Sequence, residues 1–327
     1  MAGIPCNDYF FGILRMAVII TNRKVMQMKK ILVIGSLNMD TVIETPYMPQ
    51  SGETLAGKSI TLVPGGKGAN QAYTVGKLGG DVSMIGAVAD DSIGTVLKAN
   101  LESVGVNTSG ISTLPGATTG QAFITVDDNG ANSIILIAGT NGLVSREIID
   151  QHQNLIQACD IVMMQLEIDW NVVAYAKDLA VSMGKTVIID PAPALPGLPD
   201  SFWQGVDYIK PNETELEILA GRPLSCQADL AAAAGEMFSK GVRNVMVSLG
   251  GDGCLLMNRE GTHFYPAKKV HAVDTTAAGD CFMGAFALAL SKGADVAEAI
   301  TYGQKASAIA VTRKGAQSSI PNPEEIQ

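Results

Sequence analysis

Two segments of the chain carry residue types whose spacing suits chemistry on an anion. Residues 273–280 place small side chains and Gly279 directly before Asp280, and an apolar run follows. This pattern is typical of a loop that becomes a helix N-terminus, where unpaired backbone N–H groups and the helix dipole favour negative charge. A carboxylate there can accept a proton from an attacking hydroxyl, so we interpret Asp280 as a general base, with a helix cap as the alternative. The amides expected to face a transferring phosphate are those of Ala277, Ala278 and Gly279.

The second segment, residues 65–70, reads Gly-Gly-Lys-Gly-Ala-Asn and suits hydrogen bonding to a polyhydroxyl ligand. It lacks the Ser or Thr and the spacing of a Walker A loop, and it is not a dinucleotide fingerprint. A plain glycine turn before a helix is the alternative. Together the two segments suggest phosphoryl transfer to an alcohol without a P-loop.

Asn38 and Asp40 follow the first predicted strand and are separated by one residue, so they point the same way if the chain stays extended. Polar side chains at the carboxyl end of a buried strand suggest a ligand crevice. A turn explains these two residues equally well.

Apolar runs alternate with helical patterns, which predicts βαβ units. Expected strands are 31–35, 82–88, 161–165, 186–190, 208–210 and 244–248, with a later antiparallel pair at 254–258 and 262–265. Expected helices are 69–78, 93–104, 145–157, 172–183, 213–220, 228–239, 280–290 and 294–311. The fold class is therefore α/β, a three-layer, doubly wound, mostly parallel sheet flanked by helices.

Two segments break this alternation, at about residues 41–63 and 118–138. The first contains Pro46, Pro49 and Gly52, and the second contains the hairpin signal Asp-Asp-Asn-Gly at 127–130. Because they cannot pack as helices over the sheet, we interpret them as a small β-sheet lid. Residues 30–327 then form one kinase-like α/β domain with this lid.

Composition limits the partners. The chain has 327 residues and a net charge of −9, with scattered basic residues, so nucleic acid and anionic membranes are poor partners. Five cysteines without CxxC spacing suggest free thiols and a cytoplasmic location. Residues 1–29 contain an apolar stretch too short to span a bilayer, with no signal-peptide pattern. We expect a disordered arm or an upstream translation start there.

Six motifs in register give the chain a resemblance to the ribokinase-like carbohydrate and adenosine kinase family. They begin at residues 35, 65, 164, 211, 274 and 312 and span almost everything after Lys30. The resemblance implies sugar contacts from Asn38, Asp40, Gly66, Lys67, Asn70 and Glu167, beside the base Asp280. It implies ATP contacts from Asn212, Ser248, Gly250, Gly251, Gly253, Gly279 and Gln304.

The resemblance also implies two cations and a partner. Asn212 and Glu215 would organise Mg²⁺ through water, although a helix cap alone explains their spacing. A monovalent cation, K⁺, would lie at Asp274, Thr276, Ala310, Arg313, Gly315 and Ser319, with ordinary loop packing as the alternative. The lid would pair two chains into a homodimer, whereas an intramolecular flap is the simpler reading.

The implied activity is ATP-dependent phosphorylation of D-ribose at O5, giving D-ribose 5-phosphate and ADP. Fructose, 2-keto-3-deoxygluconate, deoxyribose and adenosine are alternative acceptors. A sugar-binding protein without catalysis is a further alternative. A nucleotide-dependent dehydrogenase is disfavoured by the missing dinucleotide fingerprint.

Overall fold

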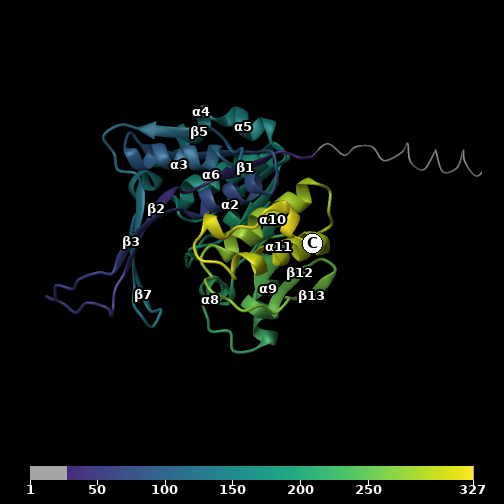
Figure 1. The fold of residues 1–327 in the computed structure, drawn as a ribbon. Coiled ribbons are helices and arrows are strands. Elements are labelled where there is room, and N and C mark those ends of the chain that lie inside the picture. The colour runs from purple at the N-terminus through teal and green to yellow at the C-terminus, as the bar shows by residue number, and fades with distance from the viewer. Residues whose placement is uncertain (1–27, 327) are drawn as a thin grey trace, which may run out of the picture.

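The computed structural model describes residues 28–326, and the expectations for the N-terminal extension fall on residues 1–27, outside this part. Its main element is a nine-stranded sheet in the order β13-β12-β11-β10-β9-β8-β1-β4-β5 (Figure 1). The strands from β11 to β5 pair in parallel, and β12 and β13 are antiparallel at one edge. The strands are β1 (Ile31–Ile34), β4 (Val82–Ala89), β5 (Asn107–Leu114), β8 (Ile161–Met164), β9 (Thr186–Ile189), β10 (Tyr208–Ile209), β11 (Asn244–Ser248), β12 (Gly253–Asn258) and β13 (Gly261–Pro266).

Helices cover both faces of this sheet. Alternate residues of β1 enter two separate apolar cores, Leu32 and Ile34 in one and Ile31 and Val33 in the other, because strand side chains alternate. The first core is closed by α4 (Arg146–Gln151), α5 (Gln153–Ala158), α6 (Trp170–Ser182), α7 (Asp200–Trp203), α8 (Glu213–Ala220) and α9 (Gln227–Ser239). The second is closed by α2 (Lys67–Lys77), α3 (Ser92–Glu102), α10 (Ala278–Ser291) and α11 (Val296–Ala310). The three-layer α/β prediction is confirmed.

A separate four-stranded sheet forms the lid. Its strands are β2 (Asn38–Glu44), β3 (Ser59–Gly65), β6 (Gly120–Val126) and β7 (Asn132–Ile137), in the order β3-β2-β6-β7. β2 and β6 pair in parallel, and the two outer strands pair with them antiparallel. Figure 1 shows this sheet projecting from the main domain at the side of α2 and α8. The predicted β lid is confirmed, and Asn38 and Asp40 belong to its first strand.

Two details differ from the prediction. β5 was not expected, because its sequence mixes Asn, Thr, Ser and Gly with few large apolar residues; it pairs with β4 through an irregular register. The single helix expected at 145–157 is two helices that meet at His152, whose φ of −112° departs from helical geometry. Neither difference touches the site.

Among the helices of residues 28–326, none combines the length and the apolar character that a bilayer crossing requires.

Candidate active site

Asp280 lies in the first turn of α10, and its side chain is buried. The helix begins after Ala277, which has a left-handed φ of 56°, unusual for a residue with a Cβ. This turn aims the carboxylate at α2, where the Asn70 side-chain amide donates a hydrogen bond to Oδ2 at 2.9 Å and the Gln71 amide donates to Oδ1 at 3.2 Å. The predicted base therefore has a fixed orientation.

Burial changes the chemistry of this carboxylate. Loss of solvent raises the pKa of Asp280 to about 6; Lys67 and the hydrogen bond from Asn70 oppose this, while Asp190 and Glu167 add to it. An aspartate with the ordinary pKa of about 3.9 is a weak base. In the structure Asp280 is a stronger base whose pKa lies nearer to neutral pH.

The predicted amide donors differ in how they are used. The Ala278 N–H donates to the Thr275 carbonyl at 3.2 Å, so it closes a turn. Ala278 and Gly279 nevertheless both line the cavity described below, next to Asp280. The N-terminus of α10 therefore faces that cavity.

The predicted sugar residues gather on the other side of Asp280. Burial, with Glu167 and Asp280, raises the pKa of Asp40 to about 6, which places these carboxylates within electrostatic reach of one another. A Cβ at Gly65 would lie 2.3 Å from Oδ2 of Asp40, so a side chain there would displace the Asp40 carboxylate. Gly66 adopts a φ of 87°, which other residues rarely adopt.

Glu167 organises the glycine turn. Its Oε2 accepts hydrogen bonds from the Ser36 hydroxyl at 2.5 Å and from the Lys67 N–H at 2.9 Å. Burial lowers the pKa of the Lys67 ammonium, but Asp280, Asp190 and Glu167 raise it above its ordinary value, so Lys67 is charged. The turn thus holds a cation beside the base.

Further side chains hold the sugar-side residues in place. The Asn141 amide donates to Oδ1 of Asn38 at 2.7 Å, and the Gln317 amide donates to Oδ1 of Asn70 at 3.0 Å. The second bond fixes which end of the Asn70 amide faces Asp280. Nothing in the sequence singled out Asn141. Gln317 lies in the motif that begins at residue 312, but the sequence analysis gave it no role.

A cavity of about 320 Å³ adjoins the N-terminus of α10. It brings together every residue predicted to contact ATP: Asn212, Ser248, Gly250, Gly251, Gly253, Gly279 and Gln304. Apolar residues that the sequence did not single out, among them Val270, Phe282 and Val311, form much of its wall. Such a wall suits a flat purine ring, with polar groups toward α10 for phosphates.

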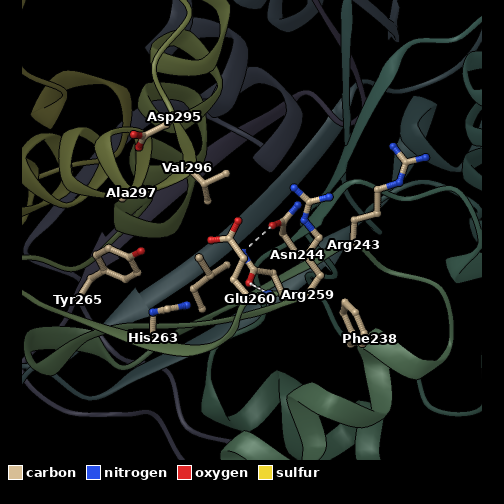
Figure 2. A pocket seen from close by; sticks show the side chains of 12 residues that line it. Phe238, Arg243, Asn244, Arg259, Glu260, His263, Tyr265, Asp295, Val296 and Ala297 are labelled. Carbon is tan, nitrogen blue, oxygen red and sulfur yellow. Dashed lines mark hydrogen bonds between the residues drawn. The ribbon is translucent and has the colours of Figure 1, made fainter.

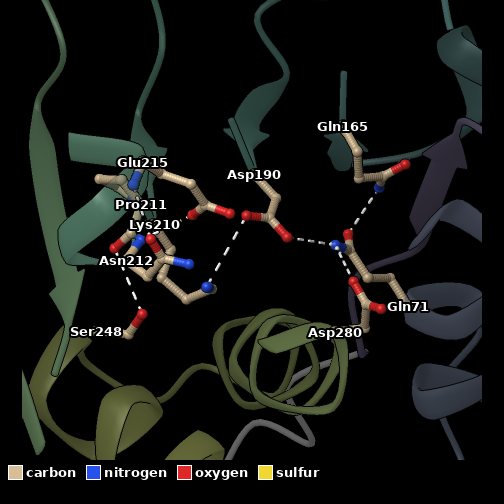
Figure 3. Close-up of polar contacts among 9 residues, drawn as sticks. All are labelled: Gln71, Gln165, Asp190, Lys210, Pro211, Asn212, Glu215, Ser248 and Asp280. Atoms are coloured by element: carbon tan, nitrogen blue, oxygen red, sulfur yellow. Dashed lines mark hydrogen bonds and ion pairs between the residues drawn. The ribbon is translucent and has the colours of Figure 1, made fainter. Parts of the chain in front are cut away.

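The ends of three neighbouring strands add polar groups that the sequence argument did not assign. Figure 3 shows Gln165, Asp190 and Lys210 converging with Gln71 and Asp280. Each of the first three residues ends a predicted strand, and carboxyl ends of parallel strands meet at one edge of a sheet. Their position at the ends of predicted strands was therefore the sequence feature that could have identified these three residues.

The Asn212 and Glu215 pair forms a capping box at the start of α8. The Asn212 N–H donates to Glu215 Oε2 at 2.8 Å, and the Glu215 N–H donates to Asn212 Oδ1 at 2.8 Å. The helix cap, which the sequence analysis gave as the alternative explanation of this spacing, is therefore present in the structure. Burial and the nearby Asp190 also raise the pKa of Glu215, which places its carboxylate at the site.

The predicted monovalent-cation loop is held by Asp274. Its Oδ1 accepts from the Thr276 N–H at 2.9 Å and hydroxyl at 2.6 Å, and its Oδ2 accepts from the Gly315 N–H at 2.8 Å. Burial raises the pKa of Asp274, but these hydrogen bonds outweigh it and hold the pKa below the usual value. The Arg313 N–H donates to the Ala310 carbonyl at 3.0 Å, and the Ser319 hydroxyl donates to the Ala316 carbonyl at 2.7 Å.

A larger cavity, of about 740 Å³, lies elsewhere (Figure 2). It is lined by Asn244 at the start of β11. Ser248, at the end of the same strand, lines the cavity of about 320 Å³ next to α10, which we call the nucleotide-side cavity because it holds the residues predicted to contact ATP. None of the predicted site residues lines the larger cavity. Within residues 28–326, no cluster of three or more His, Cys, Asp or Glu side chains is suited to hold a metal.

Comparison with known proteins shows the family of the chain. The pfkB family carbohydrate kinase model matches residues 28–323. A ribokinase of Haemophilus influenzae is 40% identical over 297 residues, covering 91% of this chain and 97% of the relative. A deoxyribokinase of Salmonella typhi is 40% identical over 295 residues, covering 90% and 96%. The structure of Arabidopsis thaliana ribokinase complexed with ribose and ATP matches with a TM-score of 0.85 at 29% identity, covering 92% of this chain and 98% of that chain. The chain belongs to the pfkB family of carbohydrate kinases.

Proposed function

We propose that this kinase transfers the γ-phosphoryl group of ATP to O5 of D-ribose, giving D-ribose 5-phosphate and ADP. The observation that carries the proposal is the position of Asp280. Its carboxylate is hydrogen-bonded to Asn70 on the sugar side, and the adjacent Gly279 lines the nucleotide-side cavity. A hydroxyl bound against the glycine turn therefore meets both the base and a terminal phosphate.

In the proposed reaction the sugar oxygen forms a bond to the γ-phosphorus while the bond to the β-phosphate oxygen breaks and ADP leaves. Asp280 accepts the hydroxyl proton. Because this transition state is loose, positioning and charge compensation contribute more than strong proton abstraction. The charged Lys67 lies where it can stabilise the developing negative charge.

Asp40, Asn38, Gly66 and Glu167 are the proposed hydroxyl-binding residues around Lys67 and Asn70. Their arrangement supports this role, because one lid strand, the glycine turn and the loop after β8 bring them to a common place beside Asp280. The lid would then cover the sugar and limit transfer of the phosphoryl group to water.

Two cations are proposed to assist. The single carboxylate of Glu215 with the Asn212 amide suits Mg²⁺, which keeps most of its waters and would neutralise phosphate charge. Carbonyl oxygens of the loop around Asp274 suit K⁺, which would order the segment leading into α10. The hydrogen bonds of Asp274 support a structural link between that loop and the base-bearing helix.

Deoxyribose is the second candidate acceptor. The observation that favours it is the deoxyribokinase relative, whose identity to this chain equals that of the ribokinase relative. The two sugars differ by one hydroxyl, and a site built to hydrogen-bond that hydroxyl discriminates strongly against the analogue that lacks it.

Coupled ADP release from MgATP tests the proposal with D-ribose, 2-deoxyribose, fructose, 2-keto-3-deoxygluconate and adenosine, each in potassium or sodium. We expect the highest kcat/KM with ribose. A higher kcat/KM with deoxyribose or another acceptor would reassign the substrate. Binding of a sugar without any turnover across the panel would contradict catalysis and favour a sugar-binding role.

We further propose that the lid joins two chains into a homodimer and that the protein works in the cytoplasm. The second proposal is supported by the free thiols of Cys159, Cys226, Cys254 and Cys281 in the described part of the chain.

A further inference from the structure

Two buried charged groups near the nucleotide-side cavity have no role in the reaction outlined above. Asp190 is 3% exposed and Lys210 is 4% exposed. The Lys210 ammonium lies 3.9 Å from Oδ1 of Asp190, which is beyond hydrogen-bond distance. Within residues 28–326, Oδ1 of Asp190 has no hydrogen-bond partner at all. This loosely paired arrangement is costly, because buried charges are stabilised only by close contacts.

Lys210 is the member of this pair that borders the cavity. Lys210 lines the cavity wall, and its Nζ lies 3.4 Å from the point that a Cβ on Gly279 would occupy. The ammonium is therefore placed at the N-terminus of α10, beside Gly279, whose amide is proposed to face the terminal phosphate. An anionic phosphate oxygen supplies the close partner that Lys210 lacks.

Asp190 is also linked to the base. The Gln71 side-chain amide donates to Oδ2 of Asp190 at 3.0 Å and to Oδ1 of Asp280 at 3.2 Å (Figure 3). The Gln165 amide donates to Oε1 of Gln71 at 2.7 Å, which fixes the orientation of the Gln71 amide. One NH₂ group thus holds the two carboxylates on either side of it.

We propose that Asp190 is a positioning residue that connects the nucleotide-side cavity to the base, through Lys210 on one side and through Gln71 on the other. This inference rests on the proposed kinase function. Before ATP binds, Lys210 partly neutralises Asp190. A bound phosphate attracts the ammonium, so that Asp190 exerts its full negative charge across Gln71 and makes Asp280 a better proton acceptor when the acceptor hydroxyl is poised to attack.

The charged groups around Asp280 act on its pKa in opposite directions. Lys67 from α2 favours the ionised carboxylate, whereas Asp190, Glu167 and Asp40 disfavour it. Removing the charge of Asp190 therefore lowers the pKa of Asp280. Removal of a nearby cation would instead raise the pKa of Asp280.

Asp190→Asn tests the link to the base, because it keeps an oxygen for Gln71 but removes the charge. We expect the acidic limb of the kcat/KM profile for the sugar, measured at saturating ATP so that it reports the ATP-bound enzyme, to move to lower pH by roughly half a unit or more. At the same time kcat at neutral pH falls because the base is weaker. A merely structural role for Asp190 leaves the limb where it is in the unaltered protein, and that result would overturn the proposal.

Lys210→Met tests the link to the cavity. We expect KM for ATP to rise by roughly tenfold or more while KM for the sugar changes little, since one charge-assisted contact is lost. The matched control is Lys177→Met, a lysine that is 2% exposed on α6 and contacts the carbonyls of Ser201 and Gln204. Equal KM values for ATP in the two variants would refute the role of Lys210.

Two further measurements distinguish an effect of these substitutions on folding from an effect on function. If either single variant is unstable, Asp190→Asn combined with Lys210→Met removes both buried charges and should restore the melting temperature while retaining the raised KM for ATP. The thermal shift caused by ATP, measured without sugar, reports the Lys210 contact independently of turnover. An unaltered protein without activity toward any acceptor contradicts the proposed function, whereas an active protein with unchanged profiles in the variants contradicts this inference alone.

Discussion

The surroundings of Asp280 suit its proposed role as general base, because burial raises its pKa to about 6 while Asn70 and Gln71 fix its direction. Asp280→Asn keeps the shape and removes the proton acceptor. We therefore expect kcat to fall by roughly 10²–10⁴ with sugar affinity largely retained. Coupled ADP release and calorimetric sugar binding check this. Asp295→Asn, at the N-cap of α11, is the matched control, and near-normal turnover of Asp280→Asn would rule out the role as base.

The pH dependence follows from the same carboxylate. Both Asp280 and the nearby Asp40 have a pKa raised to about 6, mainly by burial. A base must be unprotonated to act, so kcat/KM should be constant above this pH and should decline as the pH falls through about 6. The apparent value belongs to the interacting pair. A rate profile that stays flat down to pH 4.5, with the protein still folded, would contradict this prediction.

At the level of elements, the segment that leads into α10 decides where the base lies. Asp274 ties this segment to Gly315 and to Thr276, and Ala277 then turns the chain into the helix. Asp274→Ala removes these hydrogen bonds and the carboxylate beside the proposed K⁺ loop. We expect kcat to fall several-fold and the difference between potassium and sodium to disappear at matched ionic strength. Retained potassium stimulation in this variant would place the cation elsewhere.

The elements differ in how well the sequence predicted them. The strands of the parallel sheet were foreseeable because both of their faces are buried, so each appears as a continuous apolar run, as in β1 and β11. β5 lacks such a run and was missed. The glycine turn and Asp280 were recognised from residue types, whereas Asp190 and Lys210 are single polar residues whose importance depends on which strands are neighbours. That order is a property of the sheet, which local sequence does not encode.

At the scale of the whole molecule, the lid leaves an apolar surface uncovered. Paired positions across its four strands place Leu62, Thr41, Phe123 and Ile135 in one row. Leu62 and Ile135 are 62% and 63% exposed, and Ile60 and Ile137 on the same face are also exposed. A contiguous apolar surface of this kind is typical of a protein–protein interface. The opposite face carries Asp40 and faces the proposed sugar site.

This surface supports the proposed dimer and makes it testable. Leu62→Asp places a charge at the β3 end of the row, and burying that charge without a partner is strongly unfavourable. We expect analytical ultracentrifugation to show a dimer for the unaltered protein and a monomer for the variant. Because the same sheet holds Asp40 over the sugar, KM for the sugar should rise while KM for ATP changes little. Val96→Asp, which alters an exposed valine on α3, is the matched control. A protein that is monomeric before any substitution would show that the lid acts as a flap within one chain.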